Sequence, residues 1–209
     1  SDDKGEYIWI HSAAMDQSYP VLIQRAKDQS KPRPILYMLA GLDAGYGPAS
    51  WQVATDAQKF LGAKDVNVAF IIGGKSSYYA DWIRPDPKIG VNKWKTYLTE
   101  EIPPLLNEVF DSNGVNAIAG ISTSGTTVLA LAIAAPTLYR SVAAYSGCAQ
   151  ISDPIGHEAA KVIANWNYGA DIDNMYGAYP NPMWAANDPY VNAEKLRGLN
   201  IYVSSGLGL

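Results

Sequence analysis

Short apolar stretches rich in β-branched and aromatic residues recur along the chain. Polar, glycine-containing segments separate them, and several of these segments carry apolar residues at helical spacing. We expect strands at residues 7–10, 21–24, 35–39, 66–72, 115–121, 142–145 and 201–203, and helices at residues 51–60, 96–110 and 126–134. Strands that alternate with helices indicate an α/β fold with a mainly parallel sheet and helices on both faces.

Three segments qualify this simple alternation. The first two strands are close in sequence and are expected to form an antiparallel hairpin at one edge of the sheet. Pro103 and Pro104 should start or kink the helix predicted for residues 96–110, because proline cannot donate a helical hydrogen bond. Residues 152–190 are rich in Gly, Pro, Asn, Asp, Tyr and Trp, and we interpret them as an excursion near the active site.

The last predicted strand is followed by only a few residues of the given sequence. No helix after it would cover that part of the sheet. We therefore interpret residues 1–209 as a single α/β domain that is incomplete at its carboxyl terminus.

Composition narrows the classes of function. The chain has 209 residues, of which 48% are hydrophobic, and its net charge is −4. An acidic chain offers no electrostatic reason to bind nucleic acid. We find no run of about 18 apolar residues that would span a bilayer and no signal peptide; if the protein is exported, the sequence is that of the mature form. Cys148 is the only cysteine, so a multi-cysteine metal site is excluded. No metal or cofactor is expected. The simplest role for Cys148 is that of a small buried hydrophobic residue.

The stretch Gly-Ile-Ser-Thr-Ser-Gly at residues 120–125 lies between a predicted strand and a predicted helix. Serine nucleophiles of α/β-hydrolases occupy a sharp turn of this kind, written G-x-S-x-G, whose neighbours must be small. Ser122 is the candidate nucleophile. Ser124 is a rival, but the residue two positions before it is a serine instead of a glycine. The alternative interpretation is an ordinary polar cap on the following helix.

Two backbone N–H groups are candidates for an oxyanion hole. The N–H of Thr123 would point at the developing oxyanion from the positive end of the helix that follows Ser122. A second donor normally comes from the loop after an earlier strand, and Leu42 lies in such a loop after residues 35–39. Gly41 and Gly45 in that loop would alternatively serve only the geometry of a turn.

Several stretches together resemble the mycolyltransferases of mycobacteria and corynebacteria, the antigen 85 class of secreted α/β-hydrolase-fold acyltransferases. The most specific are Ser-Ser-Tyr-Tyr-Ala-Asp-Trp at residues 76–82 and Asp-Asn-Met-Tyr-Gly at residues 173–177. Residues 37–42, 93–103 and 120–125 also match, in the same order along the chain.

The resemblance implies a reaction in two steps through an acyl-enzyme. A serine takes a mycolyl group from trehalose monomycolate and passes it to a trehalose, arabinogalactan or protein acceptor in the cell envelope. Ser122 matches the family nucleophile, and Leu42 and Thr123 match the oxyanion-hole positions. The resemblance also makes Asp43, Trp51 and Trp82 the expected substrate-binding residues.

The sequence departs from the family in the sugar-binding loop. Ala40 stands where the family has an aspartate, Asp43 where it has an arginine, and Ala54 where it has an asparagine. Each lost hydrogen bond can change affinity by about 1 kcal/mol, so we expect a rebuilt sugar site.

The base that a serine nucleophile needs is missing from the expected place. The resemblance implies a glutamate and a histidine after the strand at residues 201–203. The only histidines are His11, in the predicted hairpin, and His157, interpreted as a surface residue at the start of a helix. Either a carboxyl-terminal remainder supplies the glutamate and histidine, or the chain is a non-catalytic relative that binds glycolipid or a matrix protein. A serine carboxylesterase of the esterase D or feruloyl esterase type is the alternative enzyme, since it shares the acyl-enzyme.

Overall fold

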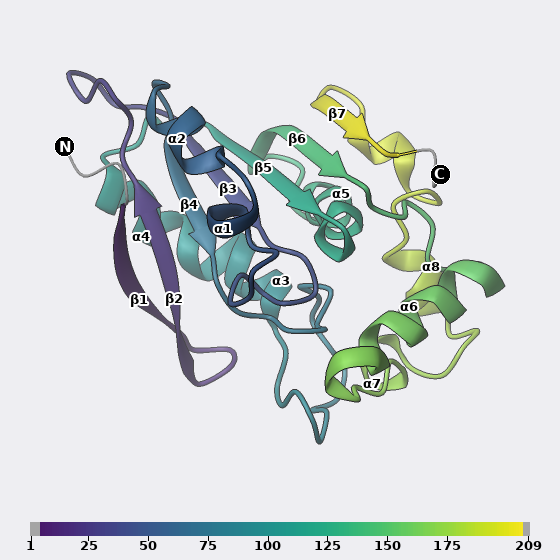
Figure 1. Cartoon of the computed structure of the whole chain (residues 1–209). Coiled ribbons are helices and arrows are strands. Elements are labelled where there is room, and N and C mark those ends of the chain that lie inside the picture. Colours follow the sequence, from purple (N-terminus) through teal and green to yellow (C-terminus); the bar gives the residue numbers. More distant parts are fainter. Residues whose placement is uncertain (1–4, 207–209) are drawn as a thin grey trace.

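The computed structural model describes residues 5–206, which form one mixed sheet with helices on both faces (Figure 1). The strands are β1 (Glu6–Ser12), β2 (Gln17–Gln24), β3 (Ile35–Leu39), β4 (Asn67–Ile71), β5 (Asn116–Ile121), β6 (Tyr139–Tyr145) and β7 (Asn200–Ser204). The helices are α1 (Trp51–Ala54), α2 (Ala57–Gly62), α3 (Trp94–Thr96), the π-helix η1 (Tyr97–Glu101), α4 (Ile102–Phe110), α5 (Thr123–Ala134), α6 (Pro154–Tyr168), α7 (Asp173–Tyr176), α8 (Pro182–Ala186) and the 3₁₀-helix η2 (Ala193–Leu196).

The strand order within the described residues is β1-β2-β4-β3-β5-β6-β7. The pair β1–β2 is the predicted antiparallel hairpin at one edge, β2 is antiparallel to β4, and the remaining neighbours are parallel. The predicted mainly parallel sheet is therefore confirmed. β2 and β6 begin earlier than predicted, because Gln17 still pairs with Ser12 and Tyr139 with Asn116.

Alternating residues of the central strands separate two cores. On one face Tyr37, Leu39 and Ile71 pack with residues of α4 and α5, whereas on the other Met38 and Phe70 pack with residues of α1 and α2. Central parallel strands that are buried on both faces have nearly continuous apolar sequences. For this reason residues 35–39 and 66–72 could be predicted as strands from the sequence.

Two predicted helices are divided in the structure. Residues 51–60 form α1 and the start of α2, because the Thr55 hydroxyl donates to the Trp51 carbonyl and accepts from the Ala57 N–H, which ends the first helix. The helix predicted for residues 96–110 contains the π-helical turn η1 just before Pro103. Prolines cannot donate to the preceding turn, so the irregular turn falls where the sequence predicted a start or kink.

The excursion at residues 152–190 has a small core of its own. α6, α7 and α8 gather beside the carboxyl ends of β5 and β6 (Figure 1). Met175 and Trp184 are buried there against Trp82, which comes from the segment after β4. α6 begins at Pro154, because the Asp153 side chain accepts from the Gly156 N–H and caps the helix.

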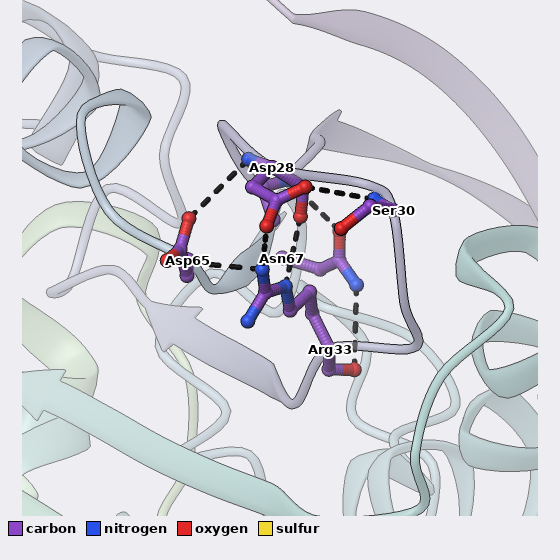
Figure 2. Close-up of polar contacts among 6 residues, drawn as sticks. Asp28, Ser30, Arg33, Asp65 and Asn67 are labelled. Carbon is purple, nitrogen blue, oxygen red and sulfur yellow. Dashed lines mark hydrogen bonds and ion pairs between the residues drawn. The ribbon is translucent and has the colours of Figure 1, made fainter.

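A cluster of charged and polar residues fastens the β2–β3 connection to the entry of β4 (Figure 2). The Arg33 guanidinium pairs with Asp28 and lies 3.8 Å from the Asp65 carboxylate. Asn67 accepts from the Ala26 N–H at 3.0 Å and faces the Arg33 carbonyl at 3.5 Å. These contacts join the two segments at the amino-terminal side of the sheet, away from the carboxyl ends of the parallel strands. No described helix is long and apolar enough to cross a membrane.

Candidate active site

The carboxyl ends of the central parallel strands meet at one edge of the sheet. Leu39 of β3 is in register with Gly120 of β5, and Ile121 is in register with Tyr145 of β6. The loop after β3 therefore adjoins the turn after β5. A Cβ built on Gly41 would lie 3.6 Å from the Ser122 Cβ, which brings the candidate nucleophile and the candidate oxyanion loop together.

Ser122 occupies a strained turn between β5 and α5. Its backbone has φ 60° and ψ −121°, a conformation that costs a non-glycine residue about 1–3 kcal/mol. The turn is held by a hydrogen bond from the Ser122 N–H to the Tyr145 carbonyl at 2.9 Å, and by one from the Gly125 N–H to the Ser122 carbonyl at 3.0 Å. The residue itself is exposed. This geometry presents the serine to solvent at the edge of the sheet, as a nucleophile requires.

The neighbouring glycines allow this turn to pack closely. A Cβ on Gly120 would lie 2.4 Å from the Ser124 carbonyl oxygen. A Cβ on Gly147, after β6, would lie 2.4 Å from the Gly125 carbonyl carbon. Real Cβ atoms do not approach backbone so closely, so these positions require glycine for the fit between the turn and the loop after β6. The part played by Gly147 was not identified from the sequence.

Ser124 is not the nucleophile in this geometry. Its side chain is fully buried, and its hydroxyl accepts from the Ile121 N–H at 2.8 Å. The hydroxyl also lies 3.1 Å from the Leu39 carbonyl and 3.0 Å from the Ile121 carbonyl. Ser124 thus ties the turn to the end of β3 and has no surface for a substrate.

The two predicted oxyanion donors lie on either side of Ser122. Thr123 is the first residue of α5, and Leu42 follows Gly41 in the loop after β3. Among the described residues, neither the Thr123 N–H nor the Leu42 N–H donates to an acceptor. The positive end of α5 and two unused N–H groups can stabilise negative charge that develops beside the serine hydroxyl.

The three residues expected to bind substrate also make contacts within the protein. Trp82 is 1% exposed and donates its indole N–H to the Ser77 carbonyl, so it belongs to the core of the excursion. Trp51 is half-buried, donates to the Leu39 carbonyl at 2.8 Å and packs edge-on against Tyr145. Asp43 turns inward: Oδ1 accepts from the Gly45 N–H, and Oδ2 is buried. Trp82 therefore offers almost no surface in this structure, whereas Trp51 and Asp43 are only partly buried. Substrate contact by these residues stays a prediction.

The environments of both histidines differ from that of a catalytic base. His157 is buried, not on the surface as expected, with ring centroids 4.6 Å from those of both Tyr179 and Trp184. His11 lies on β1, at the far edge of the sheet from β5. Neither hydrogen bonds to Ser122 in the part of the chain that the structure describes.

The expected burial of Cys148 was also wrong. The residue is exposed in the loop after β6, directly after Gly147, which packs closely against the serine turn. Within residues 5–206, His, Cys, Asp and Glu side chains form no group of three that could hold a metal ion.

Asp188 is a supporting residue whose role the sequence did not reveal. Its buried carboxylate accepts four backbone N–H groups: Oδ2 from Ile151 and Ser152, and Oδ1 from Tyr190 and Val191. Although burial alone would raise it, the pKa of Asp188 is lowered by these hydrogen bonds. The residue therefore fixes the start of the excursion beside the loop after β6. An aspartate before a Pro-Tyr turn is a recognisable signal for such local bonding.

The sheet order, the strained serine between β5 and α5, and the paired N–H donors define an α/β-hydrolase fold. The chain belongs to the putative esterase family, whose model matches residues 12–208.

The relatives found are acyltransferases by name. The chain is 32% identical over 200 residues to the diacylglycerol acyltransferase/mycolyltransferase Ag85B of Mycobacterium avium, covering 93% of this chain and 59% of that protein. It is 31% identical over 210 residues to Ag85A of Mycobacterium tuberculosis, covering 97% of this chain and 61% of that protein. The chain thus spans about three fifths of the length of these relatives.

Solved structures support the same fold. The crystal structure of MPT51 from Mycobacterium tuberculosis superposes with a TM-score of 0.83 at 25% identity, covering 96% of this chain and 74% of that one. FphF, a fluorophosphonate-binding serine hydrolase of Staphylococcus aureus, superposes with a TM-score of 0.71 at 15% identity, covering 97% of this chain and 91% of that one. The second likeness concerns the fold alone.

Proposed function

We propose that this chain carries the nucleophile and oxyanion hole of a secreted cell-envelope acyltransferase. The enzyme would move a mycolyl or other long-chain acyl group from trehalose monomycolate to a trehalose, cell-wall glycan or protein acceptor. The observation that carries the proposal is the exposed Ser122 at φ 60°, flanked by the unused N–H groups of Leu42 and Thr123. The names of the relatives support the transfer of an acyl group.

The proposed reaction has two steps, acylation of Ser122 and transfer of the acyl group to the acceptor. The Ser122 Oγ attacks the ester carbonyl carbon of the donor while its proton passes to a base, and the N–H groups of Leu42 and Thr123 hold the oxyanion. The sugar leaves as an alcohol after taking that proton. The hydroxyl of the acceptor then gives its proton to the base and attacks the acyl-enzyme, which returns Ser122 to its starting state.

We propose that the base comes from outside the 209 residues. Neither described histidine hydrogen bonds to Ser122, and His157 is enclosed by Tyr179 and Trp184. A carboxyl-terminal remainder that carries a glutamate and a histidine would complete the triad, and the greater length of the relatives is consistent with this. Without a base, a serine hydroxyl is a poor nucleophile at neutral pH.

The sugar site is proposed to differ from that of the resembled family. Ala40 carries no polar side chain, and the Asp43 carboxylate is directed into its own loop. The donor sugar would therefore be held by other groups at the carboxyl edge of the sheet.

Transfer and hydrolysis are distinguished by the fate of the acyl group. Incubation of the full-length protein with trehalose monomycolate should yield a product whose acyl group has moved to the second sugar, resolved by thin-layer chromatography and mass spectrometry. Free mycolic acid without a transferred product would favour the esterase alternative. Recovery of unchanged substrate, under conditions in which it binds, would favour a non-catalytic glycolipid-binding protein.

A further inference from the structure

The segment between β4 and α3 supports both sides of the oxyanion hole. The Gly73 N–H donates to the Ala44 carbonyl in the loop after β3, at 2.9 Å. Farther along, the Tyr78 carbonyl accepts from the Thr127 hydroxyl in the first turns of α5, at 2.6 Å. One short segment thus touches the loop that carries Leu42 and the helix that carries Thr123.

This segment is strained. Ser76, Tyr78 and Tyr79 all have positive φ, at 53°, 53° and 49°. Non-glycine residues in this region cost free energy and persist where surrounding contacts demand them, often at functional sites. Tyr79, the last of the three, is buried in the protein.

Tyr79 is held rigidly, yet its hydroxyl makes no hydrogen bond. The ring packs edge-on against Trp94 with centroids 5.5 Å apart, and a Cβ on Gly74 would lie 2.8 Å from a ring carbon. The side chain is 1% exposed. Among the described residues, the buried hydroxyl has no partner, which is costly for a polar group.

A complementary atom lies in the adjacent loop. Asp43 Oδ2 is also buried and also without a partner in the part of the chain that the structure describes. Burial raises the pKa of Tyr79, and the nearby negative charge of Asp43 raises it further, whereas the neighbouring Ala40 backbone N–H lowers it by less. The net direction is upward, so the phenol remains a protonated donor at neutral pH. A donor hydroxyl and an acceptor carboxylate oxygen are therefore both buried, and lie close enough for the Asp43 charge to act on Tyr79, without a hydrogen bond between them.

We propose that Tyr79 is a positioning residue for the oxyanion hole, and that its hydroxyl donates to Asp43 Oδ2 when the loop after β3 tightens on a bound ester. Asp43 follows Leu42 directly, so this bond fixes the direction of the Leu42 N–H. The ring is fixed by its packing, so the movement in this proposal is that of the loop. The loop consists of two turns, in which the Ala44 N–H donates to the Gly41 carbonyl and the Tyr46 N–H donates to the Asp43 carbonyl. The inference rests on the proposed function.

The test is Tyr79→Phe in the full-length protein, with p-nitrophenyl butyrate as substrate and a fluorophosphonate as covalent probe. The kcat and the labelling rate should fall by about 10- to 100-fold, because a displaced donor weakens transition-state binding, while KM changes less than about twofold. The melting temperature should not fall, because the removed hydroxyl makes no bond in the resting structure. Unchanged kcat and labelling would overturn the proposal.

Tyr37→Phe is the matched control. Tyr37 is likewise fully buried with an unpartnered hydroxyl, but it packs against Tyr139 in the core on one face of the sheet, so its removal should leave kcat unchanged. Asp43→Asn changes the proposed acceptor of the Tyr79 hydroxyl. The double variant, Tyr79→Phe with Asp43→Asn, should be no slower than the slower single variant. Additive losses would contradict a shared bond. Absence of labelling in the unmodified protein would instead refute the proposed function.

Discussion

Replacement of Ser122 by alanine should abolish turnover of p-nitrophenyl butyrate by the full-length protein, by at least about 10³-fold in kcat. The substitution removes the Oγ that forms the acyl-enzyme but retains the backbone of the turn, which is held by the Ser122 N–H and carbonyl. Circular dichroism and melting temperature should therefore match those of the unmodified protein. The measurement is steady-state release of p-nitrophenol.

Ser146→Ala is the control for this substitution. Ser146 is also an exposed serine with positive φ, and it follows the neighbouring strand β6. Its replacement should preserve turnover, since its backbone N–H, and not its side chain, is used to bond the Ser204 carbonyl. Retention of full activity by Ser122→Ala would refute the assignment of the nucleophile.

Among the substitutions considered, replacement of Asp188 by asparagine should reduce the free energy of unfolding the most. One carboxylate oxygen becomes an amide NH₂ that faces two backbone N–H donors, so hydrogen bonds are replaced by donor–donor contacts in a buried site. We expect the free energy of unfolding to fall by at least about 3 kcal/mol, measured by urea denaturation. Asp153→Asn is the control: that side chain accepts a single helix-capping bond, so its replacement should cost about 1 kcal/mol or less.

The effect of Asp188 should depend on pH in a defined direction. Because its folded-state pKa is lowered, its contribution is present above the unfolded aspartate pKa of about 4 and is lost as the pH falls through the folded-state value. The unmodified protein should therefore lose stability below about pH 4 more steeply than Asp188→Asn. Equal slopes for the two proteins would contradict a stabilising ionised carboxylate.

The sheet was predictable because its strands are chemically uniform. Residues 35–39 are apolar and are buried or nearly so, so the strand bounds followed directly from the sequence. The serine turn was predictable for a similar reason, since small residues between a strand and a helix leave few other conformations. The division of the helix at Thr55 was not predictable, because it depends on a hydroxyl competing for a helical carbonyl.

The direction of individual side chains could not be read from the sequence. Trp82 and Asp43 were expected to contact substrate. The structure adds that Trp82 is buried among residues of the excursion and that Asp43 Oδ1 accepts from the Gly45 N–H. His157 was expected at the surface because it lies at the start of a helix, but Tyr179 and Trp184 pack against it from later in the chain. Packing between distant segments decided the burial of Trp82 and His157, whereas a local turn decided the direction of the Asp43 carboxylate.

Covalent labelling tests the central claim most directly. The full-length protein is treated with a fluorophosphonate, its intact mass is measured, and the modified peptide is sequenced by tandem mass spectrometry. A single adduct on Ser122 is the predicted result, because this hydroxyl alone combines the strained turn, exposure and adjacent N–H donors among the described residues. An adduct on Ser124 or Ser146, or no adduct at all, would contradict the account.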